Sequence, residues 1–269
     1  MGTVAQDTAP PINLARVRWI GFATIVRREY DRIIRIWGQT IVPPAVNAML
    51  YFVIFGSLIG TRVGRMDGID YRQFIAPGLI MMSVIINSYS NVTSSFFGAK
   101  FGKHVEEMLV APLPSWVIVA GYTGGGVVRG LLVGGAVTIV SLLFTHLHVH
   151  HLLIVLAAVL LTSATFAVGG FLNAMLAKNF DQMNWIPTFV LTPLTYFGGV
   201  FYSVSLLPSW ARVLSYGNPI LHMVNAFRFG FLGVSDVNIA LAFGLMTAAF
   251  AALFALAVTM MDRGTGIRE

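Results

Sequence analysis

The sequence predicts an all-α polytopic membrane protein that forms a single transmembrane domain over residues 1–269. Of its 269 residues, 57% are hydrophobic and only 10% are charged, and the mean hydropathy is +0.78. So few polar residues cannot cover a soluble globule. Six apolar segments are also long enough, at roughly 20 residues or more, to cross a bilayer as helices. The chain has no cysteine, which excludes disulfides and cysteine-ligated metal sites.

An N-terminal amphipathic helix is predicted over residues 12–36, because apolar side chains recur there at spacings of three and four. Such a helix lies in the membrane interface, either as a lipid anchor alone or also as a contact for a cytoplasmic partner. We expect it not to be a cleaved signal, because about thirty polar or amphipathic residues precede the first span. Its apolar face comprises Trp19, Phe22, Ala23, Val26, Tyr30, Ile33 and Trp37, and its charged face comprises Arg28, Asp31, Arg32 and Arg35.

Six transmembrane spans are predicted to follow. An even number places both termini on one side, where eleven Lys and Arg residues then lie against five on the other side. Because basic residues concentrate on the cytoplasmic side, both termini are predicted to be cytoplasmic. The same placement beside apolar spans explains the net charge of +6 without binding to nucleic acid. The spans are 37–60, 74–97, 116–144, 152–176, 185–202 and 237–261.

The range 206–233, between the fifth and sixth spans, is broken by Pro208, Gly217 and Pro219. It is too broken to span a membrane and too apolar to be a free loop. The pattern predicts two short re-entrant helices that dip into the outer leaflet. The aromatic residues expected near the lipid headgroups are Trp210, Tyr216, Phe227 and Phe229.

Catalytic and metal-binding patterns are missing from the sequence, so we expect no enzymatic activity, no metal and no cofactor bound by this chain. The nearest approach to a phosphate-binding loop, "GAKFGKH" at residues 98–104, has one spacer too few and lacks the Ser or Thr that binds magnesium. The histidines of "HLHVHH" at 146–151 have no carboxylate nearby, which favours a solvated outer turn over a metal site. Neither a hydrolytic triad nor a membrane carboxylate pair is present.

Polar residues inside the spans define a candidate path. Arg129 is the one formal charge placed well inside a span, and it follows a glycine run that permits close helix approach. Its role is either structural or contact with a substrate. The second span carries a polar stripe at spacings of four, four and three, which either bonds neighbouring helices or lines a wet path. The stripe consists of Ser83, Asn87, Asn91 and Ser94.

The fifth span contains Pro187 and Pro193, each of which removes a backbone donor, so this helix should be kinked. Its aromatic residues either form a gate for an amphiphile or simply pack. Together with the polar stripe, this span gives the candidate substrate-path residues, namely Asn87, Asn91, Pro193, Tyr196 and Phe197.

The loop after the second span, with the sequence "EEMLVAPLP" at 106–114, is predicted to be a short amphipathic helix on the cytoplasmic side. Lys103 is expected to pair with Glu107 one turn later, and Pro112 and Pro114 to stop the helix. The helix either docks in a groove of a cytoplasmic partner or rests on the membrane surface. Its apolar stripe comprises Phe101, Val105, Met108 and Leu109.

From about residue 27 to its end, the chain resembles the permeases of the ABC-2 type transporter family, which are bacterial exporter subunits. The segments that carry the resemblance are "RIWGQTIVPPAVNAMLYFVIFG", "FIAPGLIMMSVI", "VEEMLVAPLPSWVIVAGY", "PLTYFGGVFYSVSLLP" and "NPILHMVNAFRFGFLG". The resemblance implies a homodimer in the bacterial inner membrane that two copies of a separate ATPase drive. ATP and Mg would be used by that partner, and the path would run between the permeases along spans one, two and five.

In this family the loop after the second span is a coupling helix, which maps onto residues 100–114. The residues expected to contact the ATPase are Lys103, Val105, Glu106, Glu107, Met108, Leu109 and Pro112, and the helix over 12–36 corresponds to an interface helix with Arg28, Arg32 and Arg35. The expected cargo is a hydrophobic or amphiphilic drug, lipid or glycolipid. The alternative function is a stand-alone secondary transporter or channel, which should carry titratable groups deep in its spans.

Overall fold

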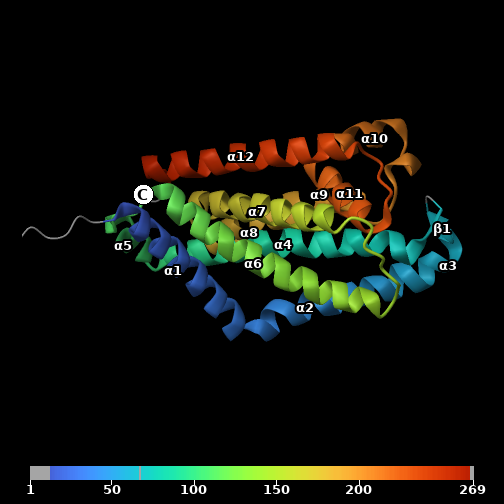
Figure 1. Ribbon diagram of the computed structural model, residues 1–269, viewed down its shortest axis with the longest axis horizontal. Helices are drawn as coiled ribbons and strands as arrows, with labels where there is room; N and C mark the ends of the chain where they lie inside the picture. Colours follow the sequence, from blue (N-terminus) through green and yellow to red (C-terminus); the bar gives the residue numbers. More distant parts are fainter. Residues whose placement is uncertain (1–12, 67, 267–269) are drawn as a thin grey trace, which may run out of the picture.

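The computed structural model describes residues 13–66 and 68–266, and within them five helices are long and apolar enough to cross a membrane. These helices run side by side along the long axis of the molecule (Figure 1). They confirm the all-α polytopic membrane class, and one of them has the predicted bounds of 152–176. The five are α2 with its continuation (Trp37–Gly56), α4 (Tyr71–Phe101), α6 (Ser115–Leu142), α7 (Leu152–Leu176) and α12 (Ile239–Arg263).

The N-terminal part begins with α1 (Leu14–Arg35), followed directly by α2 (Trp37–Tyr51). Pro43 and Pro44 lie inside α2. The helix continues after α2 as a π-helix over Phe52–Ile59 and then as the short α3 (Gly60–Val63). A two-stranded antiparallel hairpin that the sequence did not predict, β1 (Arg65–Met66) and β2 (Ile69–Asp70), leads into α4.

The central helix is α4, which packs against α6, α7 and α11. Its most apolar stretch is 83% buried, whereas that of α12 is only 11% buried and so faces outward. An outward apolar surface is what a helix in contact with lipid needs.

The apolar core is divided into two clusters by a polar layer. On α4 the first cluster ends at Ile85 and the second begins at Val92, and α6 and α7 show the same interruption. The interruption matters because each polar group buried there needs a partner or a ligand. We define the polar layer as Asn87, Ser88 and Asn91 of α4, Arg129 of α6, and Thr162 and Ser163 of α7.

Glycines of α6 let the neighbouring helices come close on two sides. A Cβ added at Gly125 would lie 2.5 Å from the Cβ of Glu29 on α1, and one at Gly126 would lie 2.6 Å from the Cβ of Ala167 on α7. Both distances are shorter than any normal carbon contact, so only glycine fits. The close approach expected of this glycine run is therefore present, and it joins α1 to the bundle.

The predicted fifth span, 185–202, is not one regular α-helix, because the helical run is continuous over 180–196 but contains a π-helical segment and ends before the predicted bound. The chain forms α8 (Phe180–Ile186), a π-helix (Pro187–Leu191) and α9 (Thr192–Tyr196), and then irregular turns. The cause is that Pro187 and Pro193 interrupt the backbone ladder, and Gly199 then takes a positive φ of 69°. Within the described residues, five spans rather than six meet the length of a bilayer.

Residues 203–233 form a 3-10 turn (Val204–Leu206) and two helices, α10 (Ser209–Tyr216) and α11 (Pro219–Leu232). Trp210 is 66% exposed, but Phe227 is buried, so its predicted place near the headgroups is wrong. Arg228 is also buried, since its guanidinium lies 3.9 Å from the centre of the Phe74 ring and donates to the Gly199 carbonyl at 2.6 Å. Helix α11 therefore belongs to the core, where α4 and α7 hold it.

Candidate functional site

A cavity of about 390 Å³ lies beside the polar layer, between α2, α4, α6 and α9. Its lining mixes apolar side chains with amide, hydroxyl and guanidinium groups, a composition typical of small-molecule sites of this size. Arg129 is the only charged residue among the described residues that line it. The polar lining consists of Gln39, Asn47, Tyr51, Ser83, Asn87, Arg129, Thr192 and Tyr196.

The depth of this cavity follows from the positions of its residues along their helices. Arg129 lies at the middle of α6 and Asn87 near the middle of α4. At 1.5 Å per residue, each is roughly 20 Å from either end of its helix. The cavity is thus at the middle of the bundle, where an uncompensated charge costs about 2.5 to 3.5 kcal/mol on insertion scales.

Arg129 has little within the protein to compensate that cost. Its Nη2 donates to Asn87 Oδ1 at 3.4 Å, a long contact. Its Nε is buried and has no hydrogen-bond partner among the described residues. Asn87 in turn donates to the carbonyl of Ser83 at 3.0 Å, so its oxygen remains directed toward Arg129. The described residues form no salt bridge with Arg129.

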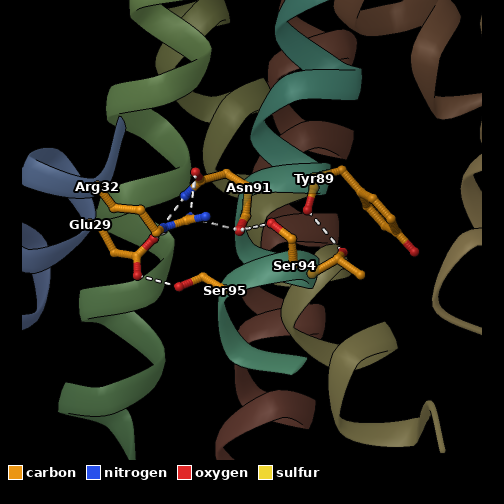
Figure 2. Close-up of polar contacts among 7 residues, drawn as sticks. Glu29, Arg32, Tyr89, Asn91, Ser94 and Ser95 are labelled. Atoms are coloured by element: carbon orange, nitrogen blue, oxygen red, sulfur yellow. Dashed lines mark hydrogen bonds and ion pairs between the residues drawn. The ribbon is translucent and has the colours of Figure 1, made fainter. Parts of the chain in front are cut away.

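One helical turn away, Glu29 and Arg32 of α1 meet Asn91 and Ser95 of α4 (Figure 2). The Glu29 carboxylate is 1% exposed and accepts from Arg32 Nη2 at 2.8 Å, from Asn91 Nδ2 at 3.1 Å and from the Ser95 hydroxyl. Arg32 Nη2 also donates to Asn91 Oδ1 at 2.8 Å and to the Asn91 carbonyl at 3.2 Å. We call these four residues, Glu29, Arg32, Asn91 and Ser95, the α1–α4 clasp. One carboxylate and one guanidinium make the clasp electrically neutral.

The clasp refines one prediction and supplies a residue that the sequence reasoning missed. Arg28, Arg32 and Arg35 line the same surface of α1, as expected, and Arg28 and Arg35 are exposed. The Arg32 guanidinium, however, also reaches Glu29 and Asn91 inside the bundle. Glu29 was not singled out. It lies three residues after Val26 and four before Ile33, on the apolar stripe, and that spacing was the available signal.

The predicted path residues separate into two groups. Asn87 and Tyr196 line the cavity, and the Tyr196 hydroxyl lies 3.2 Å from the Tyr51 hydroxyl. Asn91 belongs to the clasp instead, and neither Pro193 nor Phe197 is among the lining residues. Phe197 directly follows α9 and is 51% exposed. Of the polar stripe on α4, Ser83 and Asn87 therefore face the cavity, whereas Asn91 bonds a neighbouring helix.

The second candidate site is the short helix α5 (His104–Val110), which lies beside the C-terminal end of α4 (Figure 1). It is shorter than the predicted range of 100–114, because α4 continues to Phe101. Lys100 lies within α4 and donates to the carbonyls of Met175 and Ala177 at the end of α7, at 2.7 and 2.9 Å. A cation at the C-terminal end of a helix is favoured by the exposed carbonyls there.

The side chains of α5 divide between the bundle and the outside. Val105 is 1% exposed and packs in the second apolar cluster, and Met108 Sδ accepts from the Tyr122 hydroxyl at 3.8 Å. Glu106, Glu107 and Pro112 are exposed, while the side chain of Leu109 lies outside what the structure describes. Of the predicted apolar stripe, Val105 and Met108 thus hold α5 on its own bundle, whereas Phe101 ends α4 and is 67% exposed. The carboxylates of Glu106 and Glu107 face outward.

Lys103 differs from its prediction. It is the residue before α5 and has a left-handed conformation, with φ 59°. No salt bridge joins Lys103 to Glu107 in the part of the chain that the structure describes. The reason is that Lys103 lies in the turn between α4 and α5, so it is not part of the helix that carries Glu107.

Metal-binding clusters of three or more His, Asp or Glu residues do not occur among the described residues. The backbone N–H groups of His150 and His151 both donate to the Gly230 carbonyl, at 3.0 and 2.8 Å. The His151 ring stacks on Phe229. This turn therefore fastens α7 to α11.

Comparisons with known proteins agree on a single family. A family model described as "ABC-2 type transporter" matches residues 21–232. The chain is 52% identical over 251 residues to the inner membrane transport permease YadH of Escherichia coli strain K12, which covers 93% of this chain and 98% of that relative. It is 25% identical to nodulation protein J of Rhizobium leguminosarum bv. viciae, over 91% of this chain and 95% of the relative. Nodulation protein J of Neorhizobium galegae is 22% identical over 98% of each chain.

Proposed function

The chain belongs to the ABC-2 type transporter family, and from that premise we propose that it is the permease subunit of an ABC exporter for an amphiphilic or hydrophobic substrate. The observation that carries the proposal is the mixed polar and apolar cavity at mid-bundle. An amphiphile needs both kinds of surface, because its tail prefers apolar walls and its head group requires hydrogen-bond donors.

Two permeases would form the pathway, with the cavity of each facing the seam between them. This arrangement is supported by outward apolar side chains of α2 and of the π-helix that continues it, since Val42, Val46 and Val53 are all between 45% and 47% exposed. Two helices with such surfaces would cover each other in a homodimer. The cavity residues of α2 and α9 would then line the seam.

ATP hydrolysis would come from a separate ATPase, two copies per dimer, which would bind ATP and Mg and dock on α5. The exposed carboxylates Glu106 and Glu107 offer an acidic contact, and the buried Val105 offers a rigid connection to the core. Pressure on α5 would pass through Met108 and Tyr122 to α6. In this scheme the ATPase moves the helices, and the permease supplies no chemistry of its own.

The clasp would couple the N-terminal helix to the same movement. Arg28 and Arg35 are exposed for a cytoplasmic partner or for lipid headgroups, whereas Arg32 and Glu29 bind α1 to α4. A shift of α1 would therefore move α4 directly. This role requires both termini to be cytoplasmic in a bacterial inner membrane, as proposed from the distribution of Lys and Arg.

A stand-alone secondary transporter or channel is the alternative, and Glu29 is the observation that favours it. A buried carboxylate can carry protons in such proteins. Here, however, the carboxylate is paired with Arg32, accepts three hydrogen bonds and is 1% exposed. A carboxylate that is buried and has both oxygens engaged by donors in this way is held in place by its partners, which favours a structural role.

Copurification tests the proposal. The permease would be expressed with a candidate ATPase encoded beside it, purified through a tag on the permease, and assayed for ATP hydrolysis in proteoliposomes. We expect the ATPase to copurify and its activity to rise when a transported amphiphile is added. Transport by the permease alone would contradict the proposal, because it would show that no ATPase is needed.

A further inference from the structure

We propose that Arg129 is the head-group site of the cavity and that the bound molecule is an anionic amphiphile, with a phosphate or carboxylate on the guanidinium. The inference rests on the proposed export function only where it identifies this amphiphile as cargo. The observations that carry it are the charge balance of the polar layer, the unused donors of Arg129 and the shape of the lining.

The charge balance leaves one positive charge without a partner. Gly125 and Arg129 are one turn apart on α6, and Glu29 packs over Gly125. Asn91 and Asn87 are likewise one turn apart on α4. Two polar tiers are therefore stacked, the closed clasp and the open cavity. The only carboxylate of the clasp, that of Glu29, pairs with Arg32 at 2.8 Å. It therefore does not serve as the partner of Arg129.

Arg129 lines a cavity that has room for an oxyanion. A guanidinium has five N–H donors and matches phosphate or carboxylate with two parallel bonds. One Arg129 donor makes a long contact with Asn87, and the Arg129 Nε is buried without a partner among the described residues. A carboxylate side chain at this point would have closed the site, but none lines the cavity in the described part of the chain.

The rest of the lining suits the other parts of such a molecule. Hydroxyls of Tyr51 and Tyr196 and amides of Asn47 and Gln39 can donate to uncharged polar groups beside the oxyanion. Leu79, Met82 and Ile86 form an apolar wall on α4. A cationic amphiphile would be repelled by the guanidinium, and an uncharged one would leave the guanidinium without a counter-charge, so the site discriminates by charge.

The test uses the absence of cysteine from the chain. A single cysteine in place of Ser83, written S83C, puts a reactive thiol in the cavity wall. Among the described residues the Ser83 hydroxyl bonds only the carbonyl of Leu79 in its own helix, so the substitution breaks no contact between helices. The variant is placed in phosphatidylcholine nanodiscs, and the rate of N-ethylmaleimide labelling is measured with dodecyl phosphate or dodecanol, compared at equal mole fraction in the bilayer. Phosphatidylglycerol forms a third arm, which asks whether a two-chain lipid headgroup also binds.

We expect dodecyl phosphate to protect the cysteine at a concentration about tenfold lower than dodecanol, a difference worth about 1.4 kcal/mol. In S83C/R129Q the two probes should protect to within about twofold of each other, while S83C/R129K keeps part of the preference because it keeps the charge. S83C/R62Q, which removes an exposed arginine, should behave like S83C. Protection by phosphatidylglycerol as well would identify a bilayer lipid as a ligand, and protection by dodecyl phosphate alone would restrict the site to single-chain molecules.

Equal protection by the charged and uncharged probes, or an unchanged preference in S83C/R129Q, would overturn the inference. The labelling assay needs no ATPase, so its failure leaves the proposed export function standing. Conversely, a permease that copurifies with no ATPase would contradict the proposed export function, and the proposed anion site would be unaffected.

Discussion

Replacing Glu29 by Gln tests whether the clasp holds α1 to the bundle. The carboxylate is 1% exposed and accepts from Arg32, Asn91 and Ser95. Glutamine has nearly the same shape but no charge. Its oxygen can take the place of Oε2, which accepts from Arg32 and Asn91, while its NH₂ group faces the Ser95 hydroxyl, which can accept as well as donate. The main loss is therefore the charge, which leaves Arg32 without a counter-charge.

The expected loss of stability is about 3 kcal/mol, the lower end of the range for breaking a buried ion pair by removing one partner. Unfolding in mixed micelles, with a rising mole fraction of dodecyl sulfate, measures it. The matched control is Asp31→Asn on the same helix, because the Arg27–Asp31 pair is 4.0 Å apart and largely exposed. That control should change the free energy of unfolding by less than about 0.5 kcal/mol.

A double variant sharpens the reasoning. Removing both charges, in E29Q/R32Q, should destabilise less than the sum of the two single changes, since the double variant has no uncompensated buried charge. A loss below about 1 kcal/mol for E29Q alone would refute the argument. It would mean that Arg32 finds water or another acceptor, and that α1 is held by apolar contacts only.

Three further predictions concern packing, docking and the cavity. Gly125→Ala should destabilise the protein by about 2 kcal/mol, because its Cβ would lie 2.5 Å from Glu29 Cβ, whereas Gly135→Ala, with nothing within 4 Å on the same helix, should not destabilise in the same unfolding assay. Glu106→Lys and Glu107→Lys change exposed residues of α5, so the permease should fold normally while copurification and stimulation of the ATPase fall; unchanged coupling in both variants would count against docking on α5. Asn47→Trp adds bulk to the cavity from an exposed position on α2, and it should slow transport in proteoliposomes without loss of ATPase copurification. Normal transport in that variant would show that the cargo takes another route.

The helical membrane class and most helix positions could be predicted from the sequence because they depend on local properties. An apolar run of bilayer length becomes a helix whatever its neighbours are, since the backbone must satisfy its own hydrogen bonds in lipid. The bounds of α7, Leu152–Leu176, show this directly. Pro187 begins a π-helical segment within the predicted fifth span, so an irregularity is present where the prolines predicted a kink, although the helical run ends earlier than expected.

The tertiary structure alone decided what each polar side chain does. Asn87 and Asn91 have the same type and the same spacing on one helix face, yet Asn87 lies at the cavity and Asn91 in the clasp, because only Asn91 is opposite Glu29 and Arg32. Likewise, Arg228 lies in the range 206–233 that was predicted to dip into the outer leaflet, and it is buried in the protein with its guanidinium over the Phe74 ring. Periodicity gives the direction of a side chain around its own helix, whereas its partner depends on which helix packs there, and that is set by contacts between residues far apart in the chain.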